Sequence, residues 1–170
     1  MFIAAQIFRV FAAFFSILGD HADNPKKLYI YNGIGNFLAS IQYALLGAFS
    51  GAVSSMAAIL RNLIFYKNDT KKPIVALIIY LLFICLLNVP TFDGLISILP
   101  TIMVVLYTIS IYRGNMVHVR YVVIFTCFLE IIYDIYYSAY VGIIVCIVDI
   151  ILITIKLIRD KSSKNLKISV

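Results

Sequence analysis

Five charged side chains stand inside long apolar stretches of this sequence. They are Arg9, Arg61, Glu130, Asp134 and Asp149. A charge in the hydrocarbon of a membrane costs at least about 2.5 kcal/mol, so each of these side chains needs a partner, water or a function. The chemistry that they offer is ion pairing, proton binding and contact with a polar solute.

Depth along the expected helices brings three of these charges to one level. At about 1.5 Å per residue, Arg9, Glu130 and Asp149 each lie roughly 10 to 12 Å below the same membrane face. We therefore predict an ion-paired cluster in which Arg9 could pair with either carboxylate. Two interpretations stay open: a buried tie that holds helices together, or charges that line a hydrated path.

Glu130 and Asp134 are four residues apart and therefore share one face of a helix. Two carboxylates so close disfavour each other's charge, so one of them could carry a proton, which would suit proton-coupled transport. The interpretation that we favour for Asp134 is simpler. It lies near the expected outer surface of the membrane, where water would hydrate it.

Other polar and aromatic residues could have structural or functional roles. Arg61 lies about six residues from the cytoplasmic end of its helix, and we expect it to extend to the headgroups. Asn36 could hydrogen-bond a hydroxylated solute or a neighbouring helix. Four tyrosines predict an aromatic belt at the outer interface: Tyr133, Tyr136, Tyr137 and Tyr140.

The elements that position these residues follow from composition. Of 170 residues, 63% are hydrophobic and 13% are charged, which is far too apolar for a soluble domain. Long apolar segments must be helical, because lipid offers the backbone no hydrogen bonds. The sequence predicts an all-α polytopic membrane protein with seven transmembrane helices, at residues 2–18, 28–46, 49–66, 73–89, 95–112, 117–137 and 141–158.

The basic residues predict the orientation of these helices. Lys and Arg occur around the connections after the first, third and fifth helices and at the C-terminus, and the other connections have none. Cytoplasmic segments carry this excess, so we expect the N-terminus outside and the C-terminus in the cytoplasm. The net charge of +6 therefore indicates topology and not nucleic-acid binding.

The chain also repeats itself at an offset of 91 residues. Ala48 falls on Ala139, and Gly51 falls on Gly142. Helices one to three would then resemble helices five to seven, with helix four as a linker that keeps the halves parallel. We predict a 3+1+3 arrangement: a first triple-helix bundle (1–72), a linker helix (73–93), a second triple-helix bundle (94–160) and a basic cytoplasmic tail (161–170).

Short motifs resemble those of the YgjV-type bacterial inner-membrane proteins. They include GNFL (35–38), LLGAFSG (45–51), LRNLIFY (60–66), TFDG (91–94), YDIY (133–136) and AYVG (139–142), and the likeness covers about residues 17–159. This resemblance implies a multi-pass protein of the bacterial cytoplasmic (inner) membrane. That family is distantly similar to the SWEET and PQ-loop transporters, which implies a substrate path between the two bundles and a hinge at Pro100. Gln6 stands where the first bundle would have its own hinge proline.

We therefore expect a transporter, either a uniporter or proton-coupled, for a small polar solute. Its path between the bundles would contact Asn36, Glu130, Asp134 and Asp149. The alternative is a non-transporting structural or accessory membrane protein. The expected partners are the lipid bilayer and an unknown small polar solute, and a homo-oligomer stays open.

An enzyme is not expected. The two histidines, His21 and His118, lie in or at the edge of the cytoplasmic connections, so no metal centre or Ser–His pair is predicted inside the membrane. The sequence has no glycine-rich loop with a lysine that would cradle phosphates. We predict no metal and no cofactor.

Overall fold

The computed structural model describes residues 1–20, 22, 24–67, 74–113 and 116–168. These residues form seven α-helices and two short 3-10 helices, and they contain no strand. The helices are α1 (Phe2–Asp20), α2 (Pro25–Leu45), α3 (Phe49–Lys67), α4 (Ile74–Asn88), η1 (Val89–Thr91), η2 (Leu95–Ile98), α5 (Leu99–Arg113), α6 (Met116–Tyr136) and α7 (Tyr140–Ile168). The prediction of an all-helical chain with seven α-helices is confirmed.

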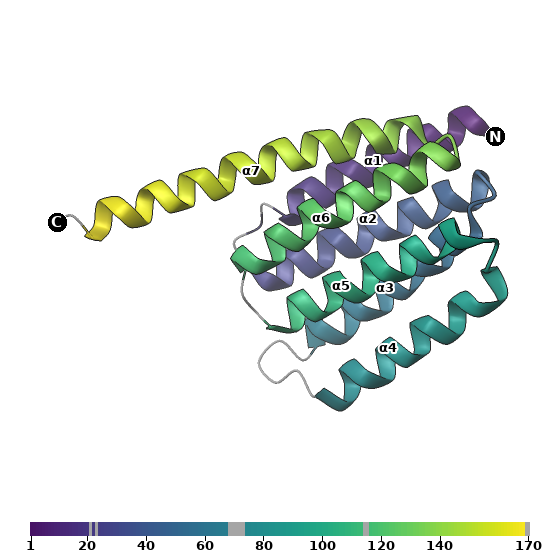
Figure 1. Ribbon diagram of the computed structural model, residues 1–170, viewed down its shortest axis with the longest axis horizontal. Coiled ribbons are helices and arrows are strands. Elements are labelled where there is room, and N and C mark those ends of the chain that lie inside the picture. Colours follow the sequence, from purple (N-terminus) through teal and green to yellow (C-terminus); the bar gives the residue numbers. More distant parts are fainter. Residues whose placement is uncertain (21, 23, 68–73, 114–115, 169–170) are drawn as a thin grey trace.

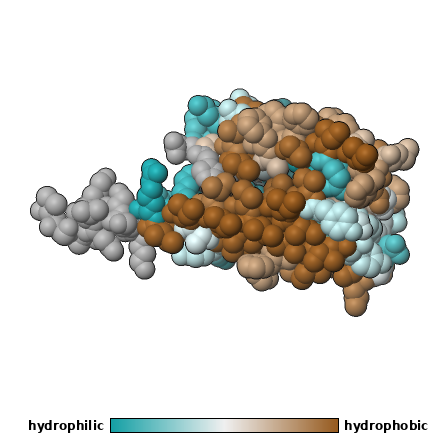
Figure 2. Space-filling view, turned by 90° about the horizontal axis from the view of Figure 1, so that it is seen from above, coloured by the Kyte–Doolittle hydropathy of each residue, from teal (hydrophilic) through white to brown (hydrophobic). Residues whose placement is uncertain are grey.

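Among the described residues, four segments are long and apolar enough to cross a membrane: Phe2–Gly19, Phe49–Lys67, Leu95–Arg113 and Tyr140–Asp160. A shorter apolar helix covers Leu77–Thr91. The helices α2 and α6 have 21 residues each, and polar residues lower their hydropathy. Large apolar side chains remain exposed along the helices, and Figure 2 shows them covering much of one face of the molecule. An apolar exterior of this extent fits contact with lipid.

Six of the helices pack in a closed ring. The helix α1 contacts α2 and α7, α3 contacts α2 and α5, and α6 contacts α5 and α7. The helix α4 lies outside this ring, against α3 and α5 (Figure 1). Successive helices run in alternate directions, so the two termini lie at opposite ends of the molecule (Figure 1).

Two tight turns repeat the same backbone conformation at the offset seen in the sequence. Gly47, between α2 and α3, has a φ of 76°, and Ser138, between α6 and α7, has a φ of 57°. The Ala48 N–H donates to the Tyr43 carbonyl at 2.9 Å, and the Ala139 N–H donates to the Asp134 carbonyl at 2.8 Å. These turns join α2 to α3 and α6 to α7 as two tight helical hairpins, and the repeat extends to their backbone hydrogen bonds.

The fifth helix begins differently from the prediction. Gly94 has a φ of 80°, and residues 95–98 form the 3-10 helix η2 before α5 starts at Leu99. Pro100 is therefore in the first turn of α5, where a helix needs no N–H from that residue. Pro100 marks a junction between two helices, and its role as a hinge stays a prediction.

Candidate functional site

A cavity of about 180 Å³ lies inside the ring of six helices. Every helix of the ring contributes a polar side chain to its lining: Arg9 from α1, Asn36 from α2, Arg61 from α3, Tyr107 from α5, Glu130 from α6 and Asp149 from α7. A cavity of about 150 Å³ is enough for a molecule of the size of benzene. The space therefore suits a small solute or several waters.

One end of the cavity holds an ion pair and a second carboxyl group. The Nη2 atom of Arg9 donates to Oε1 of Glu130 at 2.5 Å. The hydroxyl oxygen of Tyr43 lies 3.2 Å from Oε1 of Glu130 and 3.0 Å from Oδ1 of Asp134. Because one hydroxyl has one hydrogen, the two carboxyl groups share it. Of the two pairings that the sequence left open, the structure contains Arg9 with Glu130, and Asp149 lines the same cavity from α7.

Asp134 is fully buried, so the expectation that water hydrates it at the membrane surface is wrong. Its Oδ1 atom accepts the Tyr43 hydrogen bond, and its Oδ2 atom has no hydrogen-bond partner among the described residues. The expectation fails because the Asp134 side chain faces a neighbouring helix, α7. Gly142 of α7 packs so closely that a Cβ there would lie 1.9 Å from Oδ2 of Asp134 and 3.3 Å from Nε of Arg9. Depth along the helix does not reveal this contact.

Tyr133 is also fully buried, and its place in an aromatic belt is wrong. Its hydroxyl accepts the Gly51 N–H at 2.9 Å and donates to the Ala48 carbonyl at 3.4 Å. The side chain therefore ties α6 to the start of α3. Tyr136 and Tyr140 are exposed, as a belt requires.

Arg61 does not extend to the headgroups, because only 2% of its surface is exposed. Its Nε and Nη2 atoms donate to Oδ1 of Asn62 at 3.2 and 3.0 Å, and Nη1 donates to Oγ1 of Thr108 at 3.5 Å. The guanidinium carbon lies 4.7 Å from the ring centre of Tyr107, a cation–π contact. Within the described part of the chain, Arg61 forms no ion pair. The side chain turns inward because α5 supplies polar and aromatic partners there.

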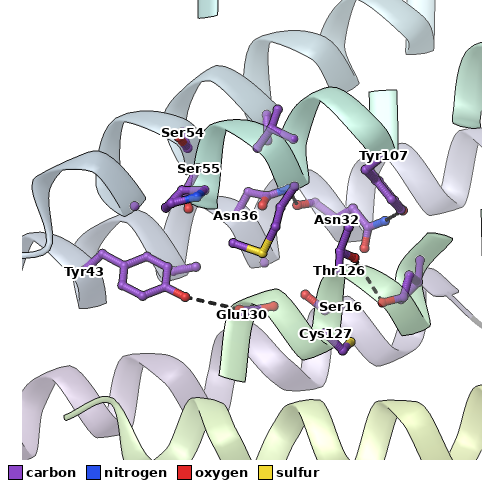
Figure 3. A pocket seen from close by; sticks show the side chains of 18 of the residues that line it. Ser16, Asn32, Asn36, Tyr43, Ser54, Ser55, Tyr107, Thr126, Cys127 and Glu130 are labelled. Atoms are coloured by element: carbon purple, nitrogen blue, oxygen red, sulfur yellow. Dashed lines mark hydrogen bonds between the residues drawn. The ribbon is translucent and has the colours of Figure 1, made fainter. Parts of the chain in front are cut away.

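The middle of the cavity is lined by amides of α2. The Asn36 side chain donates to the Asn32 carbonyl at 2.6 Å, and the Asn32 side chain donates to the Tyr107 hydroxyl at 3.0 Å. Figure 3 shows this row, from Tyr43 through Asn36 and Asn32 to Tyr107. Asn32 and Tyr107 were not predicted. Asn32 lies one helical turn before Asn36, and that spacing could have revealed it.

Three ligand-type side chains also meet beside this cavity. One ligand atom from each of Glu130, Asp134 and Cys146 lies within 4.8 Å of the others. Such a group could hold a metal ion. The guanidinium of Arg9 already contacts Glu130, however, and a second cation would be repelled by it.

The chain matches one family model, described as the bacterial inner membrane protein Imp-YgjV, over residues 3–164. The match includes every residue that lines the cavity. No curated protein and no solved structure matches the chain.

Proposed function

The chain belongs to the Imp-YgjV family of bacterial inner membrane proteins, and from that premise we propose that it transports a small polar solute. The observation that carries the proposal is the polar cavity, which all six helices of the ring line. The exterior is apolar while the interior holds charges and amides, so the polar groups gather where a solute could pass. Residues Asn36, Glu130 and Asp149 line this cavity, and Asp134 is joined to it through Tyr43.

The proposal includes a topology. All seven helices would cross the membrane, since α2 and α6 have the required length and direct polar side chains inward. The sets α1–α3 and α5–α7 would form the two halves of a 3+1+3 plan, with α4 as the linker. Basic residues near the ends of α3 and α5 and the start of α6 lie at the end where α7 projects (Figure 1): Lys67, Arg113 and Arg120. This placement supports a cytoplasmic C-terminus and an external N-terminus.

A non-transporting accessory protein would be expected to pack its interior without space. The cavity reaches both Asn36 and Glu130, and this observation favours transport over the accessory role. Polar side chains whose only role was to bond neighbouring helices would not need a common cavity that six helices line.

The shared hydroxyl of Tyr43 favours proton coupling over simple uniport. Arg9 brings one positive charge to this end, whereas Glu130 and Asp134 can bring two negative charges. One bound proton makes the group neutral, and its release leaves a buried excess of negative charge. Movement of solute through the cavity could change which of the two states is stable.

Hydrophilic labelling tests the proposal directly. In a protein without native cysteines, Asn36→Cys should react with a small membrane-impermeant thiol reagent from one side of the membrane. The matched control is Ile79→Cys on α4, because Ile79 is exposed to the expected lipid and should not react. Failure of Asn36→Cys to react from either side would contradict a transport path.

A further inference from the structure

We propose that the solute is a small monocarboxylate whose carboxylate group binds Arg61. The inference rests on the proposed function, since it takes the cavity as the solute site. The two ends of the cavity differ in charge balance: Arg9 has a carboxylate partner, and Arg61 has only neutral partners among the described residues.

A buried charge with neutral partners is unfavourable, because hydrogen bonds to neutral groups replace only part of its hydration. Asn62, Thr108 and Tyr107 supply an amide oxygen, a hydroxyl and an aromatic face to Arg61. These groups hold the guanidinium in place without neutralising it. An anion that enters the cavity would supply the missing negative charge.

The guanidinium also has donors left for a ligand. Three of its five N–H groups donate to Asn62 and Thr108, so two remain without an acceptor among the described residues. Arg61 itself lines the cavity. Arginine binds carboxylates through parallel N–H bonds in a planar fork, a geometry that lysine cannot reproduce.

The size and charge of the cavity select among anions. Arg61 supplies one positive charge, and the other cation of the lining, Arg9, is already paired with Glu130, so a second negative charge on the solute would find no free cation in the lining and would face Asp149. The volume of about 180 Å³ suits a solute of a few heavy atoms. Asn36 and Ser55 also line the cavity and can bond hydroxyl or amino groups of the solute.

Thermal unfolding of the purified full-length protein tests the inference. The probes are acetate, glycolate, lactate and 3-hydroxybutyrate, each compared with its neutral amide and with the dicarboxylate malate, at constant ionic strength. A ligand that binds only the folded form raises its Tm, so at least one monocarboxylate should raise the Tm by several degrees. Its amide and malate should have little effect.

Variants then assign the effect to Arg61. Arg61→Gln should abolish the shift, and Arg61→Lys should leave at most about a tenth of the affinity, since it keeps the charge and loses the fork. The matched control is Arg120→Gln, which removes an arginine that pairs with Asp160 away from the cavity lining. If Arg61→Gln does not fold, Arg61→Lys and the acid–amide comparison in the unmodified protein still test whether a carboxylate binds Arg61.

The outcomes separate this inference from the proposed function. Equal shifts with acid and amide, no shift with any of the four acids, or a full shift in Arg61→Lys would overturn the carboxylate assignment. Labelling of Asn36→Cys would still support a transport path in each of those cases. We expect a monocarboxylate to slow the labelling of Asn36→Cys and its amide to leave the labelling rate unchanged.

Discussion

Two buried arginines line one cavity, and among the described residues only Arg9 of the two forms an ion pair. Arg9 donates to Glu130, with Asp134 nearby through the Tyr43 hydroxyl. Arg61 contacts the amide of Asn62, the hydroxyl of Thr108 and the ring of Tyr107. The comparison teaches that burial alone does not define the role of an intramembrane charge. Arg9 has an anionic partner within the protein, whereas we propose that the charge of Arg61 is left for a solute.

This difference predicts opposite responses to substitution. Removing one partner of a buried ion pair leaves the other charge uncompensated, which is strongly destabilising. Removing a buried charge whose partners are neutral leaves only neutral groups behind. Substitutions at the Arg9 end should therefore affect folding, whereas substitutions at the Arg61 end should affect binding.

The largest effect is expected for Arg9→Met. This change leaves Glu130 charged beside Asp134 and should lower the free energy of unfolding by about 3 to 5 kcal/mol. Equilibrium unfolding of the purified protein in mixed detergent measures this loss. The double variant Arg9→Met with Glu130→Gln should recover most of the stability, and a double variant as unstable as the single one would refute the pairing.

A slightly smaller effect is expected for Gly142→Ala, which also acts at the Arg9 end. The added methyl would lie 1.9 Å from Oδ2 of Asp134, so the carboxyl must move. Overpacking of this kind costs about 1 to 3 kcal/mol, and we expect the upper part of that range. Gly33→Ala is the matched control, because nothing lies within 4 Å of its Cβ position. Equal stability of the two variants would argue against the close approach of α7 to Asp134.

Tyr43→Phe should lower the free energy of unfolding by about 2 kcal/mol, as loss of a hydrogen bond to a charged group does. It removes the hydroxyl that Glu130 and Asp134 share. Its more specific effect concerns transport. In proteoliposomes loaded with a pH-sensitive dye, solute-driven proton movement should fall by a larger factor than solute uptake does. Parallel loss of both would contradict a coupling role for this hydroxyl.

The helices and their turns could be predicted from sequence because hydropathy and small residues determine them locally. The seven apolar segments coincide closely with the helices, except that α7 continues beyond residue 158 to Ile168, and Gly47 marks a turn that Ser138 repeats. Depth also brought Arg9 and Glu130 to one level correctly. The direction of a side chain around its helix depends on which neighbour packs there. Hydropathy does not report that, so the burial of Asp134 and Arg61 was missed.

The smallest change in stability is expected for Arg61→Gln, and it gives the sharpest contrast between the two ends. The partners of Arg61 are neutral, and glutamine can still bond an amide or a hydroxyl, so the free energy of unfolding should change by less than about 1 kcal/mol. Unfolding under the conditions used for Arg9→Met measures both variants on one scale. A loss as large as that of Arg9→Met would mean that the protein itself depends on the Arg61 charge, because a charge reserved for a solute contributes little to folding in the absence of that solute.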